Sequence, residues 1–242
     1  MKRTAALIAA IFLLAAGGPP RSGYDDASPE TRAMQDDDAA NPGFLWVAQG
    51  ETQWPAPAFG GQSCALCHGP IESMRGIAAR YPAFDPKLNR IVTLRQRINL
   101  CRTTRMGAPA LEPGDVSLET AIGVRSRGMP LAVEPREPFL SAGAALFRQR
   151  MGQFNISCAQ CHDERAGQRL AGSIIPQAHP NGYPEYRLEW QGMGSLYRRI
   201  RNCMTGVRAE PFAEDSADME ALALYLAVRA NGMRIETPGV RP

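Results

Sequence analysis

Two copies of one short motif carry most of the chemistry that the sequence suggests. Cys64-Ala65-Leu66-Cys67-His68 and Cys158-Ala159-Gln160-Cys161-His162 both have the spacing C-x-x-C-H. This is the attachment motif of c-type haem, in which two thiols one helical turn apart add to the two vinyl groups. The histidine that follows is then directed at the iron. We therefore expect two haem c groups, one held by Cys64 and Cys67 and the other by Cys158 and Cys161, with His68 and His162 as iron ligands.

A zinc site made of two C-x-x-C pairs is the main alternative for these cysteines. A zinc ribbon separates its pairs by about 15–20 residues. Here 91 positions separate Cys67 from Cys158. A thioredoxin-like redox pair would not need a histidine after both motifs, so the spacing favours haem.

The two remaining cysteines reveal an internal repeat. Cys101 and Cys203 are 102 positions apart, and the same offset relates eight identical residues between 81–109 and 183–211. The haem motifs are 94 positions apart, so an eight-residue insertion follows His162. Farther on, Arg125 and Gly128-Met129 match Arg229 and Gly232-Met233 at an offset of 104. Self-similarity of this kind indicates two copies of one structural unit.

The start of the chain resembles an export signal. Lys2 and Arg3 precede an apolar run over 5–16, and Gly17-Gly18-Pro19-Pro20 follows it. This layout is typical of a secretory signal peptide and is too short to span a membrane. The alternative is a buried N-terminal helix. Because the chain uses arginine almost without lysine, as a GC-rich bacterium would, we expect a soluble periplasmic protein without a membrane span in its mature form.

These observations predict a mainly α fold of two class I cytochrome c-like domains, each with one covalently bound haem. We expect a signal peptide over 1–18, an acidic N-terminal arm over 19–40, a first domain over 41–135 and a second domain over 136–242. Asn41 looks like the N-cap of the first helix, with Pro42 at its first position. Helices are expected over 44–49, 88–103, 117–126, 138–151, 194–205 and 216–230. The formal charge of only +3 argues against nucleic-acid binding.

The second axial ligand of each iron has several candidates. Two pairs respect the repeat, Cys101 with Cys203 and Met129 with Met233, and His179 is the remaining histidine. Both cysteines precede the closing helix, where a distal ligand belongs, whereas both methionines follow it and suit core packing. A Cys101–Cys203 disulfide is an alternative, and it requires Cα atoms within about 7 Å. We favour thiolate ligation by both cysteines, which lowers a haem's reduction potential.

Arginines crowd the second of these cysteines. Arg199 precedes Cys203 by four residues and therefore shares its helix face. Arg229 lies in the closing helix of the same copy, and both arginines have counterparts in the first copy, Arg97 and Arg125. Such arginines could neutralise haem propionates or stabilise a thiolate, and a forked guanidinium also binds oxyanions such as sulfonates.

The chain resembles the SoxA family, the dihaem subunits of the SoxAX cytochrome of bacterial thiosulfate oxidation. The resemblance spans nearly the whole mature chain and is carried by three segments besides the first haem motif. They are Asn41-Pro42-Gly43-Phe44-Leu45-Trp46, the stretch from Met151 to His162, and Arg201-Asn202-Cys203-Met204 with Arg208-Ala209-Glu210-Pro211-Phe212.

The resemblance implies roles that the spacing alone does not. Cys203 would be a catalytic persulfide that ligates the second haem, Arg199 would bind substrate and Arg229 would be a second active-site arginine. Cys101 would ligate the first haem. The activity would be that of an L-cysteine S-thiosulfotransferase, which joins thiosulfate oxidatively to a cysteine of the carrier SoxYZ. Electrons would pass through haem to the partner subunit SoxX and on to small cytochromes.

Three other functions compete with this one. A plain dihaem electron carrier needs no arginine-lined substrate site. A thiosulfate dehydrogenase that forms tetrathionate needs no protein carrier, and the segment around Cys203 is closer to SoxA. A disulfide-stapled binding module without haem conflicts with the two C-x-x-C-H motifs.

Overall fold

The computed structural model describes residues 19–58 and 60–242, so the predicted signal peptide lies outside the described residues. The first copy of the repeat contains α2 (Phe44–Gln53), α3 (Cys64–His68), η1 (Ile71–Met74), η2 (Ala78–Arg80), β1 (Ala83–Asp85), β2 (Arg90–Val92), α4 (Leu94–Arg105) and α5 (Ser117–Val124). The second contains α6 (Phe139–Arg148), α7 (Cys158–His162), β3 (Arg169–Leu170), β4 (Ser173–Ile174), β5 (Glu185–Arg187), β6 (Gly192–Gly194), α8 (Leu196–Gly206) and α9 (Ala217–Arg229). Helix α1 (Pro29–Asp36) precedes both copies and strand β7 (Gly239–Arg241) follows them.

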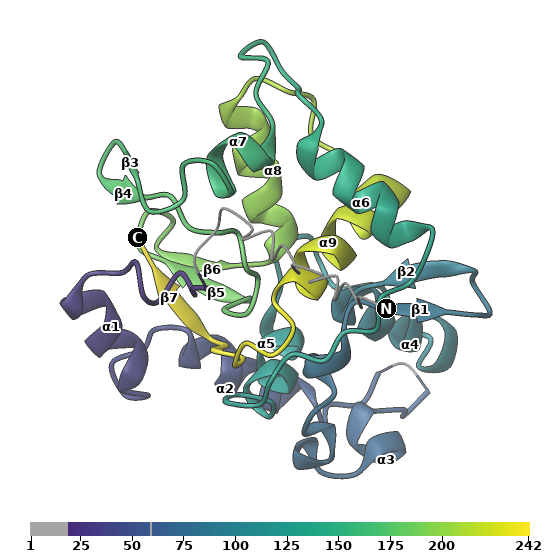
Figure 1. Cartoon of the computed structure of the whole chain (residues 1–242). Coiled ribbons are helices and arrows are strands. Elements are labelled where there is room, and N and C mark those ends of the chain that lie inside the picture. The colour runs from purple at the N-terminus through teal and green to yellow at the C-terminus, as the bar shows by residue number, and fades with distance from the viewer. Residues whose placement is uncertain (1–18, 59) are drawn as a thin grey trace, which may run out of the picture.

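Each copy is built on a close crossing of its first and last long helices, α2 with α5 and α6 with α9 (Figure 1). A glycine lies at each crossing. A Cβ atom on Gly50 would collide with the backbone oxygen of Ser117, and one on Gly143 with that of Ala221. The missing side chains let the two helix backbones touch, which brings the middle of each copy together around the haem motif.

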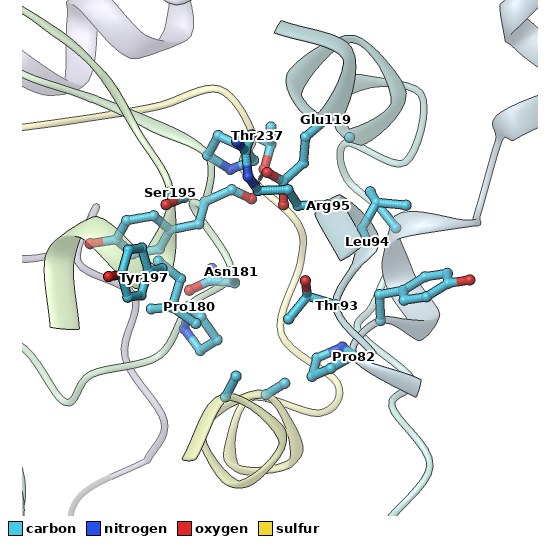
Figure 2. A pocket seen from close by; sticks show the side chains of 18 of the residues that line it. Pro82, Thr93, Leu94, Arg95, Glu119, Pro180, Asn181, Ser195, Tyr197 and Thr237 are labelled. Atoms are coloured by element: carbon cyan, nitrogen blue, oxygen red, sulfur yellow. Dashed lines mark hydrogen bonds between the residues drawn. The ribbon is translucent and has the colours of Figure 1, made fainter. Parts of the chain in front are cut away.

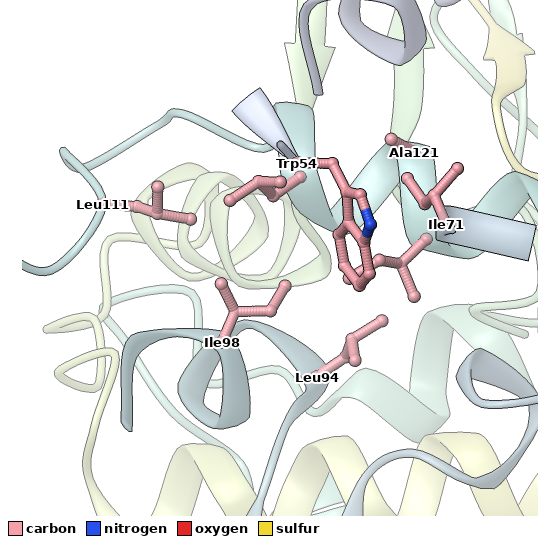
Figure 3. Close-up of a cluster of buried hydrophobic side chains, with 8 residues drawn as sticks. Trp54, Ile71, Leu94, Ile98, Leu111 and Ala121 are labelled. Carbon is pink, nitrogen blue, oxygen red and sulfur yellow. The ribbon is translucent and has the colours of Figure 1, made fainter. Parts of the chain in front are cut away.

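The apolar cores of the two copies correspond to each other. In the first copy, Trp54, Ile71, Leu94, Ile98 and neighbouring side chains form one buried cluster (Figure 3). Cys64 packs against this cluster. In the second copy, the cluster of Phe147, Ile200, Met204, Met219, Leu222 and Leu226 contacts Cys158 and Leu196. Both clusters therefore line the inner side of a haem-motif helix.

The insertion inferred from the changed offset is a β-hairpin. Strands β3 and β4 pair antiparallel between α7 and β5, whereas the first copy has only the short helices η1 and η2 between α3 and β1. After this insertion the two copies are again equivalent residue by residue. Ala83 of β1 pairs with Val92 of β2, and Glu185 of β5 pairs with Gly194 of β6. The offset of 102 between these pairs is the offset of the two cysteines.

The copies meet through a symmetric exchange of backbone hydrogen bonds. Ile235 N–H donates to Met129 O at 2.9 Å, and Leu131 N–H donates to Met233 O at 2.9 Å. These bonds are equivalent at the offset of 104, so the two chain segments are related by a local two-fold axis. The half-buried Met233 packs beside Leu131 and Ile235 in the interface, as expected of a core-filling methionine.

The acidic segment at 19–40 is folded onto the second copy. Helix α1 begins after the N-cap Ser28, whose side chain accepts from Thr31 N–H. The buried Gln35 accepts from the backbone N–H of Val240 at 2.9 Å, and α1 contacts β7. The segment is thus tied to the last strand of the chain.

Two helix starts differ from the predictions. Asn41 is not the N-cap of α2, because that helix begins at Phe44 with Gly43 as its N-cap. The Asn41 side chain instead accepts from Gly43 N–H and donates to Pro238 O. The helix expected over 88–103 begins only at Leu94, because residues 83–92 form the β1–β2 hairpin and Thr93 caps α4. The other four predicted helices are confirmed to within a few residues at either end.

Within the described ranges, no helix combines the length and the apolar character needed to cross a membrane.

Candidate functional site

A serine sets the start of each haem-motif helix. The Ser63 hydroxyl accepts from Leu66 N–H at 3.1 Å, and the Ser157 hydroxyl accepts from Gln160 N–H at 3.2 Å. Gln160 completes a capping box by accepting from Ser157 N–H. Helices α3 and α7 therefore begin at their first cysteine, which places both thiols on one turn and the histidine at the end.

The second motif histidine is oriented for metal ligation. His162 Nδ1 lies 2.7 Å from Pro176 O. A carbonyl can only accept, so Nδ1 carries the proton and Nε2 is left with its lone pair, which is the usual arrangement for a metal-bound imidazole. Burial lowers the pKa of His162, and the nearby positive charges of Arg199 and Arg229 lower it further. His68 lies beside the Trp54 ring, with 6.0 Å between the ring centroids.

The two other cysteines lie opposite the motif cysteines. Burial raises the pKa of Cys158 to about 11, and the neighbouring Cys203 adds to the rise. In the first copy, burial raises the pKa of Cys64, Arg102 opposes the rise and Cys101 adds to it. All six cysteines are in the described part of the chain and none of them forms a disulfide, so the alternative of a Cys101–Cys203 disulfide is wrong. Cys203 is exposed, whereas Cys101 is half-buried.

Helix α8 and its surroundings bring the two predicted arginines toward this site. Arg199 Nη1 lies 3.3 Å from Glu189 Oε1. Arg229 Nη2 lies 2.7 Å from Asp163 Oδ1, next to the motif histidine, and its guanidinium stacks 4.6 Å from the Phe147 ring centroid. Both arginines are close enough to lower the pKa of His162, so the structure gathers Arg199, Arg229 and His162 around one site.

Other candidate residues point elsewhere. The His179 ring makes its hydrogen bond to Arg21 O, at 2.8 Å from Nδ1. Arg198 is exposed and stacks 4.2 Å from the Trp190 ring centroid, and Arg208 stacks 5.2 Å from that of Phe154. Arg201 is also exposed. These three arginines belong to a solvated face.

A cavity of about 130 Å³ lies between the two copies, at the local two-fold axis (Figure 2). Equivalent residues line it in pairs, Tyr81 with Tyr183 and Leu94 with Leu196. None of the six cysteines contributes to its wall, so it is distinct from the haem-motif sites.

Glu119 and Arg95 face this cavity from the first copy (Figure 2). Burial raises the pKa of Glu119 to about 7, while Arg95 opposes the rise and Glu214 adds to it. The Arg95 guanidinium pairs with Glu214 at 3.1 Å and donates to the backbone oxygens of Asp115 and Glu112. Its donors are thus already used, and Glu119 Oε2 remains without a hydrogen-bond partner.

The donor set fits a c-type haem. Each motif helix carries two cysteines and one histidine beside an apolar cluster, and a further cysteine of the same copy lies near the first motif cysteine. The alternative of zinc fails on geometry, because among the residues described no three His, Cys, Asp or Glu side chains gather as a metal site. The mainly helical fold and the two motifs define a c-type cytochrome.

Comparison with known proteins narrows this class. The family model for the SoxA/TsdA cytochrome c domain matches residues 49–131 and 142–235. The SoxA subunit of L-cysteine S-thiosulfotransferase from Rhodovulum sulfidophilum is 35% identical over 229 residues, 91% of this chain and 80% of that protein. The corresponding subunit from Paracoccus pantotrophus is 35% identical over 230 residues, 91% of this chain and 78% of that protein.

Structure gives the same relationship. The crystal structure of SoxXA from P. pantotrophus contains a chain with a TM-score of 0.89 and 34% identity, covering 92% of this chain and 87% of that one. The chain belongs to the SoxA family, and it binds haem c as a cytochrome of that family.

Sequence reasoning missed the acidic partners of the site arginines. Asp163 directly follows the second motif, and Glu189 lies in the β5–β6 turn that was not predicted. The sequence does contain a signal for these turns. Asp85-Pro86 and Asn89 are residues typical of the turn of a β-hairpin, and the repeat would have extended a hairpin predicted there to the equivalent β5–β6 turn in the second copy.

Proposed function

We propose that this protein is the catalytic cytochrome subunit of an L-cysteine S-thiosulfotransferase, which joins thiosulfate to a cysteine thiol of a SoxYZ carrier. One observation carries the proposal. A cysteine outside both motifs, Cys203, lies one helical turn after Arg199 and close to Cys158, in a haem motif whose histidine is also approached by Arg229. An electron carrier without a substrate would need neither this additional sulfur nor the arginines.

Arg199, Arg229 and Cys203 have separate roles in substrate binding and sulfur transfer. Arg199 binds the sulfonate group of thiosulfate, since a guanidinium pairs well with an oxyanion. Arg229 adds a second positive charge near the motif histidine and is held by its ion pair with Asp163. Cys203, carried as a persulfide, is the sulfur that exchanges with the incoming sulfane sulfur.

The net step forms one S–S bond between the sulfane sulfur of thiosulfate and the carrier thiol, and it releases two electrons and one proton. Haem, when bound, accepts the electrons one at a time. Two haem c groups are proposed, the first held by Cys64, Cys67, His68 and Cys101. The second is held by Cys158, Cys161, His162 and Cys203.

The proposed assembly follows from the named relatives. The structural neighbour is a SoxXA complex, and a SoxX partner would take the electrons onward. The proposed domains are 41–135 and 136–242, the second being catalytic, and the chain would work in the periplasm after removal of residues 1–18.

The direct test combines protein mass with conjugation. The purified protein should carry two haems, and the peptide that contains Cys203 should carry one additional sulfur atom. With the SoxX partner, thiosulfate and reduced carrier, wild type should load the carrier cysteine, and Cys203→Ala should not, although both haems stay attached. Thr205→Ala, an exposed change on the same helix, should load the carrier normally. Full loading by Cys203→Ala would refute the proposal.

A further inference from the structure

The hairpins that precede Arg97 and Arg199 are equivalent but carry exchanged charges. Their strands pair at positions that differ by the repeat offset, and their turns end on residues with left-handed backbones, Asn89 at φ 51° and Gln191 at φ 47°. At the last position of the first strand, the first copy has Asp85 and the second has Arg187. Two residues later the order is reversed, with Lys87 in the first copy and Glu189 in the second.

In the first copy this arrangement immobilises the arginine. Asp85 is buried, with only 8% of its side chain exposed, and it forms an ion pair with Arg97 Nη2. Its other oxygen accepts from the backbone N–H groups of Lys87 at 2.8 Å and Leu88 at 3.1 Å. Arg97 holds the pKa of Asp85 below its usual range, and the backbone donors add to this effect. An anion could not readily displace a carboxylate that is held at three points.

In the second copy the arginine is held far less firmly. Glu189 pairs with Arg199 at 3.3 Å, and its side chain is 47% exposed. The same oxygen, Oε1, accepts a shorter bond of 2.8 Å from Arg187 Nε. Arg187 does not depend on Glu189 alone, because it also pairs with the buried Glu185 at 3.1 Å.

The turn that carries Glu189 has an anchor of its own. The Trp190 ring contacts two guanidiniums, with its centroid 4.2 Å from Arg198 Cζ and 5.3 Å from Arg187 Cζ. The Glu189 carboxylate can therefore move through its own side-chain torsions while the turn stays in place. An exposed ion pair of this kind is weak, since water and salt screen it.

We propose that Glu189 is a displaceable counter-ion, a positioning residue that aims Arg199 in the empty site and yields it to the sulfonate of thiosulfate. This inference rests on the proposed function and adds a residue to it. Binding exchanges one carboxylate–guanidinium pair for one sulfonate–guanidinium pair, and no covalent bond changes. The affinity for an oxyanion then depends on two competing interactions of Arg199. The anion binds only if its ion pair with Arg199 is stronger than the ion pair of Arg199 with Glu189. This competition is specific to the second copy, because in the first copy Asp85 holds Arg97 too firmly for an anion to replace it.

The test measures thiosulfate kinetics and the binding of sulfate, an oxyanion that does not react. Both assays use the haem-loaded protein with its cytochrome partner, and sulfate binding is followed by calorimetry. Glu189→Gln and Glu189→Ala remove the competing charge. Since exposed ion pairs contribute up to about 1 kcal/mol, KM for thiosulfate and Kd for sulfate should both fall about two- to fivefold, with kcat within about twofold.

Glu164→Gln is the matched control, because Glu164 is a 61% exposed glutamate near the second motif that pairs with Arg165. It should leave KM and Kd unchanged. Unchanged or weaker sulfate binding in both Glu189 variants would overturn the proposal, as would an equal gain in Glu164→Gln. If wild type fails to conjugate thiosulfate, the proposed function falls, and sulfate binding still decides the role of Glu189.

Discussion

The buried carboxyl group of Glu119 should make the stability of the folded protein depend on pH, and one substitution should remove this dependence. Its carboxyl group borders the cavity between the copies, and burial raises its pKa from 4.5 to about 7. The folded protein thus binds this proton more tightly than the unfolded chain does. The free energy of unfolding is unaffected by this group below about pH 4.5, falls as the pH rises from 4.5 to about 7, and stays reduced above that.

The size of the effect follows from the pKa change. Each pKa unit corresponds to about 1.36 kcal/mol, so a rise of about 2.5 units sets an upper limit of about 3.4 kcal/mol. The destabilisation of wild type above pH 7 should therefore be about 1–3 kcal/mol. Glu119→Gln keeps the shape of the side chain and removes the charge. The variant should be more stable than wild type by this amount at about pH 8, and the advantage should nearly vanish at about pH 4.5.

Guanidinium unfolding of the haem-loaded protein at the two pH values measures the difference directly. For a chain of this length, about 1–3 kcal/mol corresponds to a rise in Tm of about 2–10 °C. Glu112→Gln, which removes an exposed carboxylate nearby, should change stability by less than about 0.5 kcal/mol at both pH values. An equal difference between Glu119→Gln and wild type at both pH values would refute the reasoning.

Two further substitutions test the binding site and the fold. Arg199→Ala should raise KM for thiosulfate while both haems remain attached, because it removes the proposed partner of the sulfonate; steady-state kinetics at limiting thiosulfate would show an unchanged rate if the assignment is wrong. Gly143→Ala should lower the free energy of unfolding by about 1–3 kcal/mol, since its methyl group would meet Ala221 O where α6 crosses α9. Gly206→Ala, which has no neighbour within 4 Å, should be close to neutral in the same denaturant titration, and similar losses in the two variants would contradict the close-crossing argument.

Much of the architecture was predictable because it depends on residues that are near each other in the chain. Haem attachment requires two cysteines and a histidine on one helical turn, so a motif of five consecutive residues is enough to predict it. The repeat follows from identities at a constant offset, and the helices α5, α6, α8 and α9 follow from their apolar periodicity and caps. The first part of 88–103 was assigned to a helix because a short apolar run does not distinguish helix from strand. Only pairing with residues 83–85 makes the second strand.

The sequence by itself determined that this chain is a c-type cytochrome built from two copies of one unit, each with one cysteine outside its C-x-x-C-H motif, and it pointed to Arg199 and Arg229. Tertiary structure alone decided how these charges are balanced. Asp85 is buried and pairs with Arg97, whereas Glu189 is exposed and interacts with both Arg187 and Arg199. It also decided that Glu119 lacks a hydrogen-bond partner, because Arg95 is already engaged by groups more than 15 positions away along the chain. Burial and electrostatic interaction depend on distance in space, which a local pattern of residues does not specify.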